Sequence, residues 1–115
     1  MLVQSVEKMK AFSSEKMKKV KMFDSEHMFC DLYCFEPGQS QKTHLHEGED
    51  KVYYVLEGEG MFQIGGEETC VRKGSATMAE AGIMHGVVNK SSEALVVLVF
   101  MAPKPAHGKK PERKG

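Results

Sequence analysis

Short strand-like segments that follow one another from residue 19 to residue 101 constrain this chain more than any other feature. Turns separate them at regular intervals. Gly65-Gly66 is typical of a two-residue primed hairpin turn, and Pro37-Gly38 is typical of a type II turn. Such a succession favours an all-β sandwich or barrel. The predicted strands cover residues 19–25, 27–36, 41–46, 51–57, 61–64, 67–71, 75–79, 84–89 and 94–101.

The two ends of the chain differ from this central region. Residues 1–18 are predicted to be an N-terminal arm, either extended or with one short helical turn capped by Ser13 or Ser14. Residues 19–102 are the predicted barrel. Residues 103–115 contain five basic residues and one acidic residue, and we expect them to be a disordered basic tail.

Length and charge narrow the classes of function. The 115 residues are enough for one domain, and 16 basic residues balance 16 acidic ones. A net charge of zero gives no general attraction to nucleic acid or to an anionic membrane, so we expect neither as a partner. The longest apolar run, residues 94–102, is far shorter than the roughly 20 residues of a membrane span. The N-terminus has no apolar core of signal-peptide length, so we expect a cytoplasmic protein.

The three cysteines are Cys30, Cys34 and Cys70. An odd number without a Cys-x-x-Cys pair argues against a disulfide framework and against a zinc ribbon. Cys30 and Cys34 have the same strand parity, which puts them about 13 Å apart on one face, too far for a disulfide. We expect all three to be reduced.

His44-Leu45-His46 is the most informative local pattern. Residues two apart in a strand project from the same face, so the two imidazoles can converge on one metal ion. His85 lies at the start of a later predicted strand and joins them only if the chain folds back, as it does in a barrel. Neutral imidazole nitrogen suits zinc, iron, nickel and copper, and manganese with carboxylate help. On its own, the His-x-His pattern also fits two polar residues on an exposed strand face.

The residues around these histidines extend the pattern. They resemble the two signatures of the cupin superfamily over residues 30–100, most of the chain. The first signature is carried by Gly38, His44, His46, position 51 and Gly58, and the second by Gly74, position 80, Gly82, His85 and Asn89. The resemblance implies a small single-domain cupin, a jelly-roll barrel or double-stranded β-helix of roughly six to eight strands. It also implies that His44, His46 and His85 are metal ligands at one mouth of the barrel, and that the protein is a homodimer.

Lys51 departs from the family pattern, which implies a glutamate ligand at this position. A protonated lysine has no lone pair, and its charge repels a divalent cation. Three interpretations stay open. The site is a three-histidine centre with open positions, or Glu49 or Asp50 replaces the missing carboxylate, or the metal is lost and the histidines and Lys51 form a cationic pocket. Tyr53 has the strand parity of Lys51, so it either lines the pocket below it or packs in the core.

Two classes of function follow. The first is a metal-dependent enzyme, a dioxygenase or an isomerase, that acts on a small molecule with a divalent iron, manganese, nickel, copper or zinc ion as cofactor. The second is a non-catalytic module that binds an anion or a sugar in the histidine and lysine pocket. A third possibility, a purely structural interaction domain, agrees least with the sequence, because the residue spacing of both signatures is intact. The fold alone does not separate enzyme from binding module, because this superfamily carries many activities.

Overall fold

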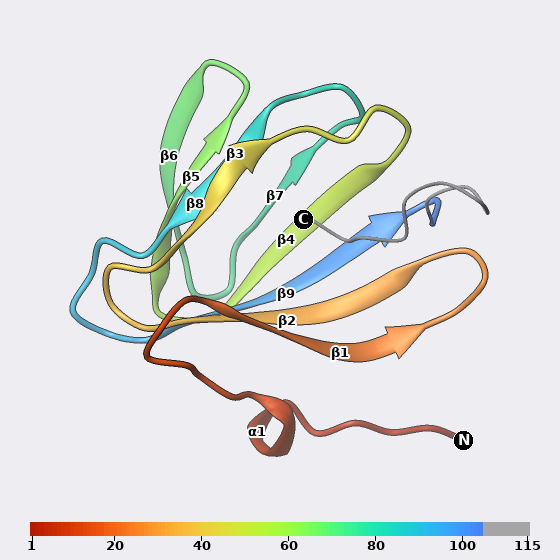
Figure 1. Ribbon diagram of the computed structural model, residues 1–115, viewed down its shortest axis with the longest axis horizontal. Coiled ribbons are helices and arrows are strands. Elements are labelled where there is room, and N and C mark those ends of the chain that lie inside the picture. Colours follow the sequence, from red (N-terminus) through yellow and green to blue (C-terminus); the bar gives the residue numbers. More distant parts are fainter. Residues whose placement is uncertain (105–115) are drawn as a thin grey trace.

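A computed structural model describes residues 1–104 of the protein (Figure 1). The predicted basic tail therefore lies outside the described residues from position 105 onward. No helix in the described range is long and apolar enough to cross a membrane. The elements are α1 (Val6–Met9), β1 (Lys18–Asp24), β2 (Phe29–Phe35), β3 (Ser40–His44), β4 (Asp50–Glu57), β5 (Glu59–Ile64), β6 (Glu67–Arg72), β7 (Ala76–Ala79), β8 (His85–Val88) and β9 (Leu95–Ala102).

All the strands predicted from the sequence are present, with differences at their ends. β2 begins at Phe29 because the residues before it form a turn, in which the backbone N–H of Ser25 donates to the carbonyl oxygen of Met28 at 3.0 Å. β3 ends at His44, two residues earlier than expected, so His46 lies in the loop that follows. The prediction placed His44 and His46 on one strand, and this part of it is wrong.

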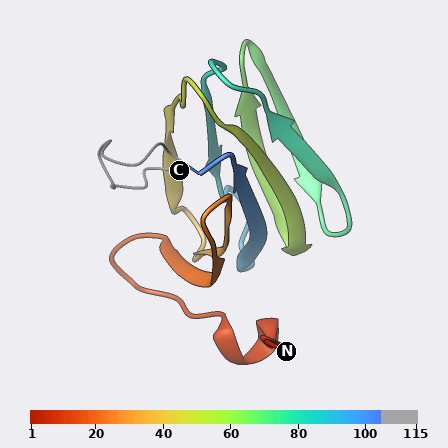
Figure 2. The ribbon, with the colours of Figure 1, turned by 90° about the vertical axis from the view of Figure 1, so that its right-hand side faces the viewer.

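Two antiparallel sheets make up the fold. The larger has the strand order β1-β2-β9-β4-β7 and the smaller has the order β3-β8-β5-β6. Figures 1 and 2 show the two sheets facing each other, with consecutive segments of chain crossing between them. This is the predicted all-β jelly-roll, the double-stranded β-helix.

The main core lies between the two sheets. Strand alternation turns every second side chain inward, and Tyr33 and Phe35 of β2 meet Tyr53 of β4, Phe62 of β5 and Val97 of β9 there. Each of these five side chains is at most 1% exposed. Burying one such side chain stabilises the fold by about 1.5–3 kcal/mol, so the inner faces of the two sheets dominate its stability.

A second apolar cluster lies on the outer face of the larger sheet. Its buried members are Met22, Leu32, Cys34 and Val96, and the N-terminal arm packs against them through Val6, Met9 and Phe12. This cover explains why β2 is buried along its whole length, on both faces.

The helical turn of the arm does not lie where the sequence suggested. The serine that caps it is Ser5, whose hydroxyl oxygen accepts from the backbone N–H of Lys8, rather than Ser13 or Ser14. The apolar residues that follow Ser5 dock on the sheet, and this tertiary contact selects the position of the turn.

Glycines form the sharp reversals, as predicted. Gly58 has a φ of +77°, and a Cβ atom there would lie 2.2 Å from the carbonyl oxygen of Ala94. No other residue fits this position between β4 and β5. The other glycines of the two signatures, Gly38, Gly74 and Gly82, also have positive φ.

The cysteines are all free, as expected. Cys30 and Cys34 are buried on the outward side of β2, and burial raises the pKa of Cys30 to about 11 and also raises that of Cys34. These two thiols therefore behave as small apolar side chains.

Candidate metal centre

The pairing of β3 with β8 brings two of the histidines together. His44, at the end of β3, lies directly opposite His85, at the start of β8, after a bulge between Gln41 and His44. Gly86 permits the close approach of the two strands. A Cβ atom at Gly86 would lie 3.0 Å from three backbone atoms of β3, namely the oxygen of Gln41 and the nitrogen and Cα of Thr43.

The third histidine is held by bonds between two loops. His46 follows β3, and its carbonyl oxygen accepts from the backbone N–H of Gly82 at 2.7 Å. The carboxylate of Asp50 accepts from the backbone N–H of Ala81 at 2.9 Å. These two bonds tie the loop that carries His46 to the loop that precedes His85.

The three imidazoles form one compact group, with ligand atoms that all lie within 4.8 Å of one another. The ring centroids of His44 and His85 are 4.4 Å apart, those of His44 and His46 are 5.0 Å apart, and those of His46 and His85 are 5.6 Å apart. The three residues come from the end of β3, from the loop that follows it and from the start of β8. Strand parity alone does not predict this arrangement.

Hydrogen bonds on the far side of two rings fix which nitrogen faces the centre. Nδ1 of His44 donates to the carbonyl oxygen of Lys42 at 2.7 Å, and Nδ1 of His85 donates to that of Ile83 at 2.9 Å. A carbonyl accepts only, so each neutral ring carries its proton on Nδ1 and has its lone pair on Nε2. The Nε2 atoms of all three histidines are buried and have no hydrogen-bond partner. Three such atoms converging on one point fit a transition metal.

Burial keeps these rings neutral. Loss of solvent, with a smaller contribution from the charge of Lys51, lowers the pKa of His44 and that of His46 to about 4. Burial also lowers the pKa of His85. Neutral imidazole is the form that binds metal, so the site is in its ligating state near neutral pH.

Lys51 lies inside the barrel and is fully buried. Its Nζ atom is 5.0 Å from the centroid of the Tyr33 ring and 5.2 Å from that of the Tyr53 ring, within cation–π distance of both. Its charge acts on each of the three histidines. The ammonium is thus an interior group beside the histidines.

The candidate fourth ligand, Glu49, lies on the other side of His46. It is 7% exposed, and its Oε1 atom is 3.9 Å from Nδ1 of His46. Asp50 accepts from Ala81. Within residues 1–104, the group of potential ligands that includes these imidazoles contains neither carboxylate.

Tyr53 lies beneath the histidines. Its ring centroid is 6.2 Å from that of His85 and 5.1 Å from that of Phe62. Its hydroxyl donates to the side-chain oxygen of Gln41 at 3.0 Å, and burial raises the pKa of Tyr53 well above its usual range. Tyr53 is therefore a neutral phenol with a fixed orientation, and it both packs in the core and borders the site.

Sequence reasoning missed Asp31, which is fully buried in the middle of β2. Its parity is that of Tyr33, so it lies on the inner face of the larger sheet. The sequence does contain a signal for Asp31, since it is the one carboxylate in the otherwise apolar run from Phe29 to Phe35. A buried charge is rare unless it has a functional or structural partner.

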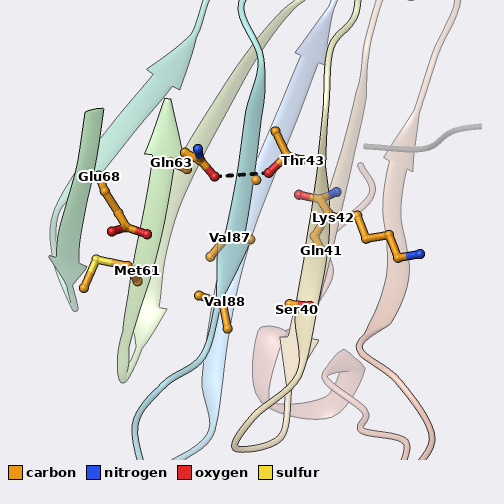
Figure 3. Close-up of a pocket in the computed structure, with 10 residues that line it drawn as sticks. Ser40, Gln41, Lys42, Thr43, Met61, Gln63, Glu68, Val87 and Val88 are labelled. Carbon is orange, nitrogen blue, oxygen red and sulfur yellow. Dashed lines mark hydrogen bonds between the residues drawn. The ribbon is translucent and has the colours of Figure 1, made fainter. Parts of the chain in front are cut away.

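A separate pocket of about 180 Å³ lies on the smaller sheet, away from the histidines. Figure 3 shows its lining residues, among them Lys42, Met61, Gln63 and Glu68, and the hydrogen bond of 3.1 Å that the Thr43 hydroxyl donates to Gln63. None of the three histidines lines it, so this pocket and the metal centre are different sites.

Comparisons with known proteins agree with this architecture. A relative from Thermotoga maritima, an oxalate-binding protein, is 34% identical over 68 residues, which are 56% of this chain and 56% of the relative. The match thus spans little more than half of that protein. An uncharacterized protein of Streptomyces coelicolor is 34% identical over 79 residues, which are 67% of this chain and 72% of the relative.

Solved structures extend the likeness to almost the whole chain. The crystal structure of TT1209 from Thermus thermophilus is 46% identical, covers 91% of this chain and 100% of its own, and superposes with a TM-score of 0.89. KdgF from a Halomonas species is 22% identical, covers 78% of this chain and 82% of its own, and has a TM-score of 0.72, which is a likeness of fold. The model of the cupin domain family matches residues 31–101. This chain belongs to the cupin family.

Proposed function

We propose that this protein is a small metal-binding cupin in which His44, His46 and His85 hold a divalent transition metal that receives a small molecule. The convergence of three buried Nε2 atoms without hydrogen-bond partners carries the proposal. A buried polar atom without a partner costs about 1–3 kcal/mol, and three at one point are hard to explain by packing alone. A metal ion satisfies all three at once.

The donor set determines what such a centre offers. When bound, a divalent metal with three protein ligands keeps coordination positions for a small molecule and acts there as a Lewis acid. The chain holds the rings in place through Lys42, Ile83 and the bonds between the two loops. Glu49 lies within 4 Å of Nδ1 of His46 and supports the orientation of that ring. We therefore assign Glu49 an orienting role rather than that of a fourth ligand.

Dioxygenase and isomerase chemistry both agree with this centre. The second candidate function is a non-catalytic binding module, and one observation favours it. Within residues 1–104, the group of potential metal ligands consists of the three histidines and includes no carboxylate. The relative from Thermotoga maritima, which carries the name oxalate-binding protein, also supports a binding role for a small carboxylate. We further propose a homodimer, while the cytoplasmic location stays a prediction.

Elemental analysis of protein purified without chelator tests the proposal. The wild type is expected to contain close to one equivalent of iron, manganese, nickel, copper or zinc, and the His44→Ala/His46→Ala double variant is expected to contain almost none. His27→Ala is the matched control, because the side chain of His27 is 87% exposed and lies outside the centre. Wild-type protein without metal, even after reconstitution with each ion, would contradict the proposal. Oxygen-uptake and isomerase assays on the loaded protein then separate the two candidate functions.

A further inference from the structure

The outer face of the larger sheet carries apolar residues that lie outside the cluster formed with the N-terminal arm. We call them the apolar strip, which consists of Phe23, Cys30, Phe100, Val52, Met78 and Tyr54. We propose that a second copy of the chain packs on this strip, face to face across a two-fold axis. The inference rests on the proposed homodimer, to which it assigns a surface, and it does not depend on the metal centre.

Strand register aligns most of the apolar strip in one row. The Cα partners run across all five strands of the sheet in the order Phe23, Cys30, Phe100, Val52 and Met78. Because neighbouring strands lie about 4.8 Å apart, this row is roughly 20 Å long. An antiparallel sheet normally turns polar residues toward water, so an unbroken apolar row on the outer face indicates a binding surface.

The N-terminal arm covers part of the adjoining row only. That row runs from Leu32 through Leu98 to Tyr54. The arm shares one apolar cluster with Leu32 and Leu98, whereas Tyr54 lies outside this cluster and is 38% exposed. The part of the face toward β4 and β7 is therefore left uncovered by the arm.

The shape of this face suits contact with an identical face. Its large side chains protrude, since Phe23 is 38% exposed and Met78 is 45% exposed. Beside Phe23 the face is hollowed into a groove of about 480 Å³, whose almost wholly apolar lining includes Cys30, Leu98 and Phe100. A two-fold interface joins the same patch of both subunits, so the patch must offer both protrusions and a recess. The outer face of the larger sheet offers both.

Charge also favours a second copy over a charged partner. No member of the apolar strip is charged, and the acidic residue at the rim of the groove is already paired. The carboxylate of Asp24 lies 2.7 Å from Nζ of Lys104 and 3.1 Å from Nζ of Lys21. Because the net charge of the chain is zero, two copies approach each other without net repulsion.

The chain itself supplies the remaining arguments. Residues 105–115 contain no large apolar side chain, so their composition does not suit them to cover the strip. Leu2 and Val3 are 68% and 75% exposed, and they begin beside the groove, because the side-chain amide of Gln4 donates to the carbonyl oxygen of Met22 at 3.2 Å. A stable dimer buries about 800 Å² on each subunit, whereas the strip, roughly 20 Å long and two rows wide, supplies on the order of 300 Å². We therefore expect Leu2 and Val3 to enlarge the interface at its edge.

Sedimentation equilibrium of the metal-free and the zinc-loaded protein tests the inference. The wild type is expected to have twice the mass of 12.8 kDa at micromolar concentration. The Tyr54→Lys/Met78→Lys double variant places unpaired charges within the interface, so its dimer dissociation constant should rise roughly 100-fold or more while its zinc content stays unchanged. Met84→Lys is the matched control, because Met84 is 43% exposed but precedes β8, outside the larger sheet, and this variant should stay dimeric.

The outcomes separate this inference from the metal centre. A monomeric wild type overturns the inference, also where the groove then binds an apolar small molecule or another protein. A double variant as dimeric as the wild type overturns it too, because the dimer then uses another surface. Should the double variant fail to fold, nuclear Overhauser effects between labelled and unlabelled wild-type chains decide. We expect them at the Met78 methyl group, and effects at Met61 of the smaller sheet with none at Met78 would overturn the inference. A dimeric wild type that takes up no zinc overturns the metal centre alone.

Discussion

Replacing Gly86 by alanine tests how the fold holds the metal ligands. Gly86 follows His85 in β8, and its missing side chain lets β8 approach β3 where His44 faces His85. An alanine Cβ would lie 3.0 Å from two backbone atoms of Thr43 and from the carbonyl oxygen of Gln41. Backbone in a paired strand cannot turn aside as a flexible side chain does, so β3 must shift by a few tenths of an ångström.

The size of the effect follows from two opposed terms. Overpacking of this kind costs about 1–3 kcal/mol. Alanine reduces the entropy of the unfolded chain relative to glycine, which returns about 0.5–1 kcal/mol. We therefore expect the free energy of unfolding of the metal-free protein to fall by up to about 2.5 kcal/mol. The shift also separates the two imidazoles, and a misplaced ligand lowers metal affinity roughly 10- to 100-fold.

Urea unfolding of the metal-free protein and competition with a chelator for bound zinc measure the two effects. Gly66→Ala is the matched control, because a Cβ atom at this exposed turn position meets no atom within 4 Å. It should leave metal affinity unchanged and stability unchanged or slightly raised. Gly86→Ala protein with wild-type stability and wild-type zinc affinity would refute the role we assign to the close approach of the two strands.

Three further predictions concern the interior, the arm and the assembly. Because burial holds the pKa of His44 and that of His46 at about 4, below the ordinary 6.5, the unfolded state takes up protons first as pH falls. The metal-free protein should thus lose about 1–2 kcal/mol per histidine between pH 6.5 and 4, after allowance for solvent screening, and a urea midpoint independent of pH in this range would contradict this. Phe12→Ala should lower the free energy of unfolding by about 1–2 kcal/mol and speed hydrogen exchange in residues 1–17, because Phe12 packs on the outer face of the larger sheet. Unchanged exchange would show that Phe12 does not dock the arm. Light scattering after size exclusion should give twice the mass of 12.8 kDa, and a monomer at micromolar concentration would remove the homodimer.

Much of the fold follows from local sequence features. The strands are short and separated by residues with a strong turn preference, so their number and order are readable without tertiary information. Pro37-Gly38 forms the predicted turn, with the N–H of Gln39 donating to the carbonyl oxygen of Glu36 at 3.1 Å and a φ of +87° at Gly38. Asn89, which completes the second signature, is fully buried and donates to the carbonyl oxygen of Glu93 at 2.8 Å.

The parts that sequence reasoning missed depend on tertiary contacts. The helical turn lies after Ser5 because Val6 and Met9 dock on the outer face of the larger sheet. His46 joins His44 from a loop, held by a bond to Gly82 that no strand parity predicts. Asp31 and Lys51 share the interior because β2 and β4 both pair with β9, a juxtaposition of segments far apart in the sequence.

X-ray absorption at the metal edge of the loaded protein tests whether the three histidines bind the metal. We expect three imidazole nitrogens at about 2.0–2.2 Å, with oxygen donors from water or a small ligand in the remaining positions. In the His44→Ala/His46→Ala variant the imidazole signal should disappear together with the metal, while His27→Ala should keep both. A first shell without imidazole, or one with sulfur from a cysteine, would contradict the assignment of His44, His46 and His85 as the metal ligands.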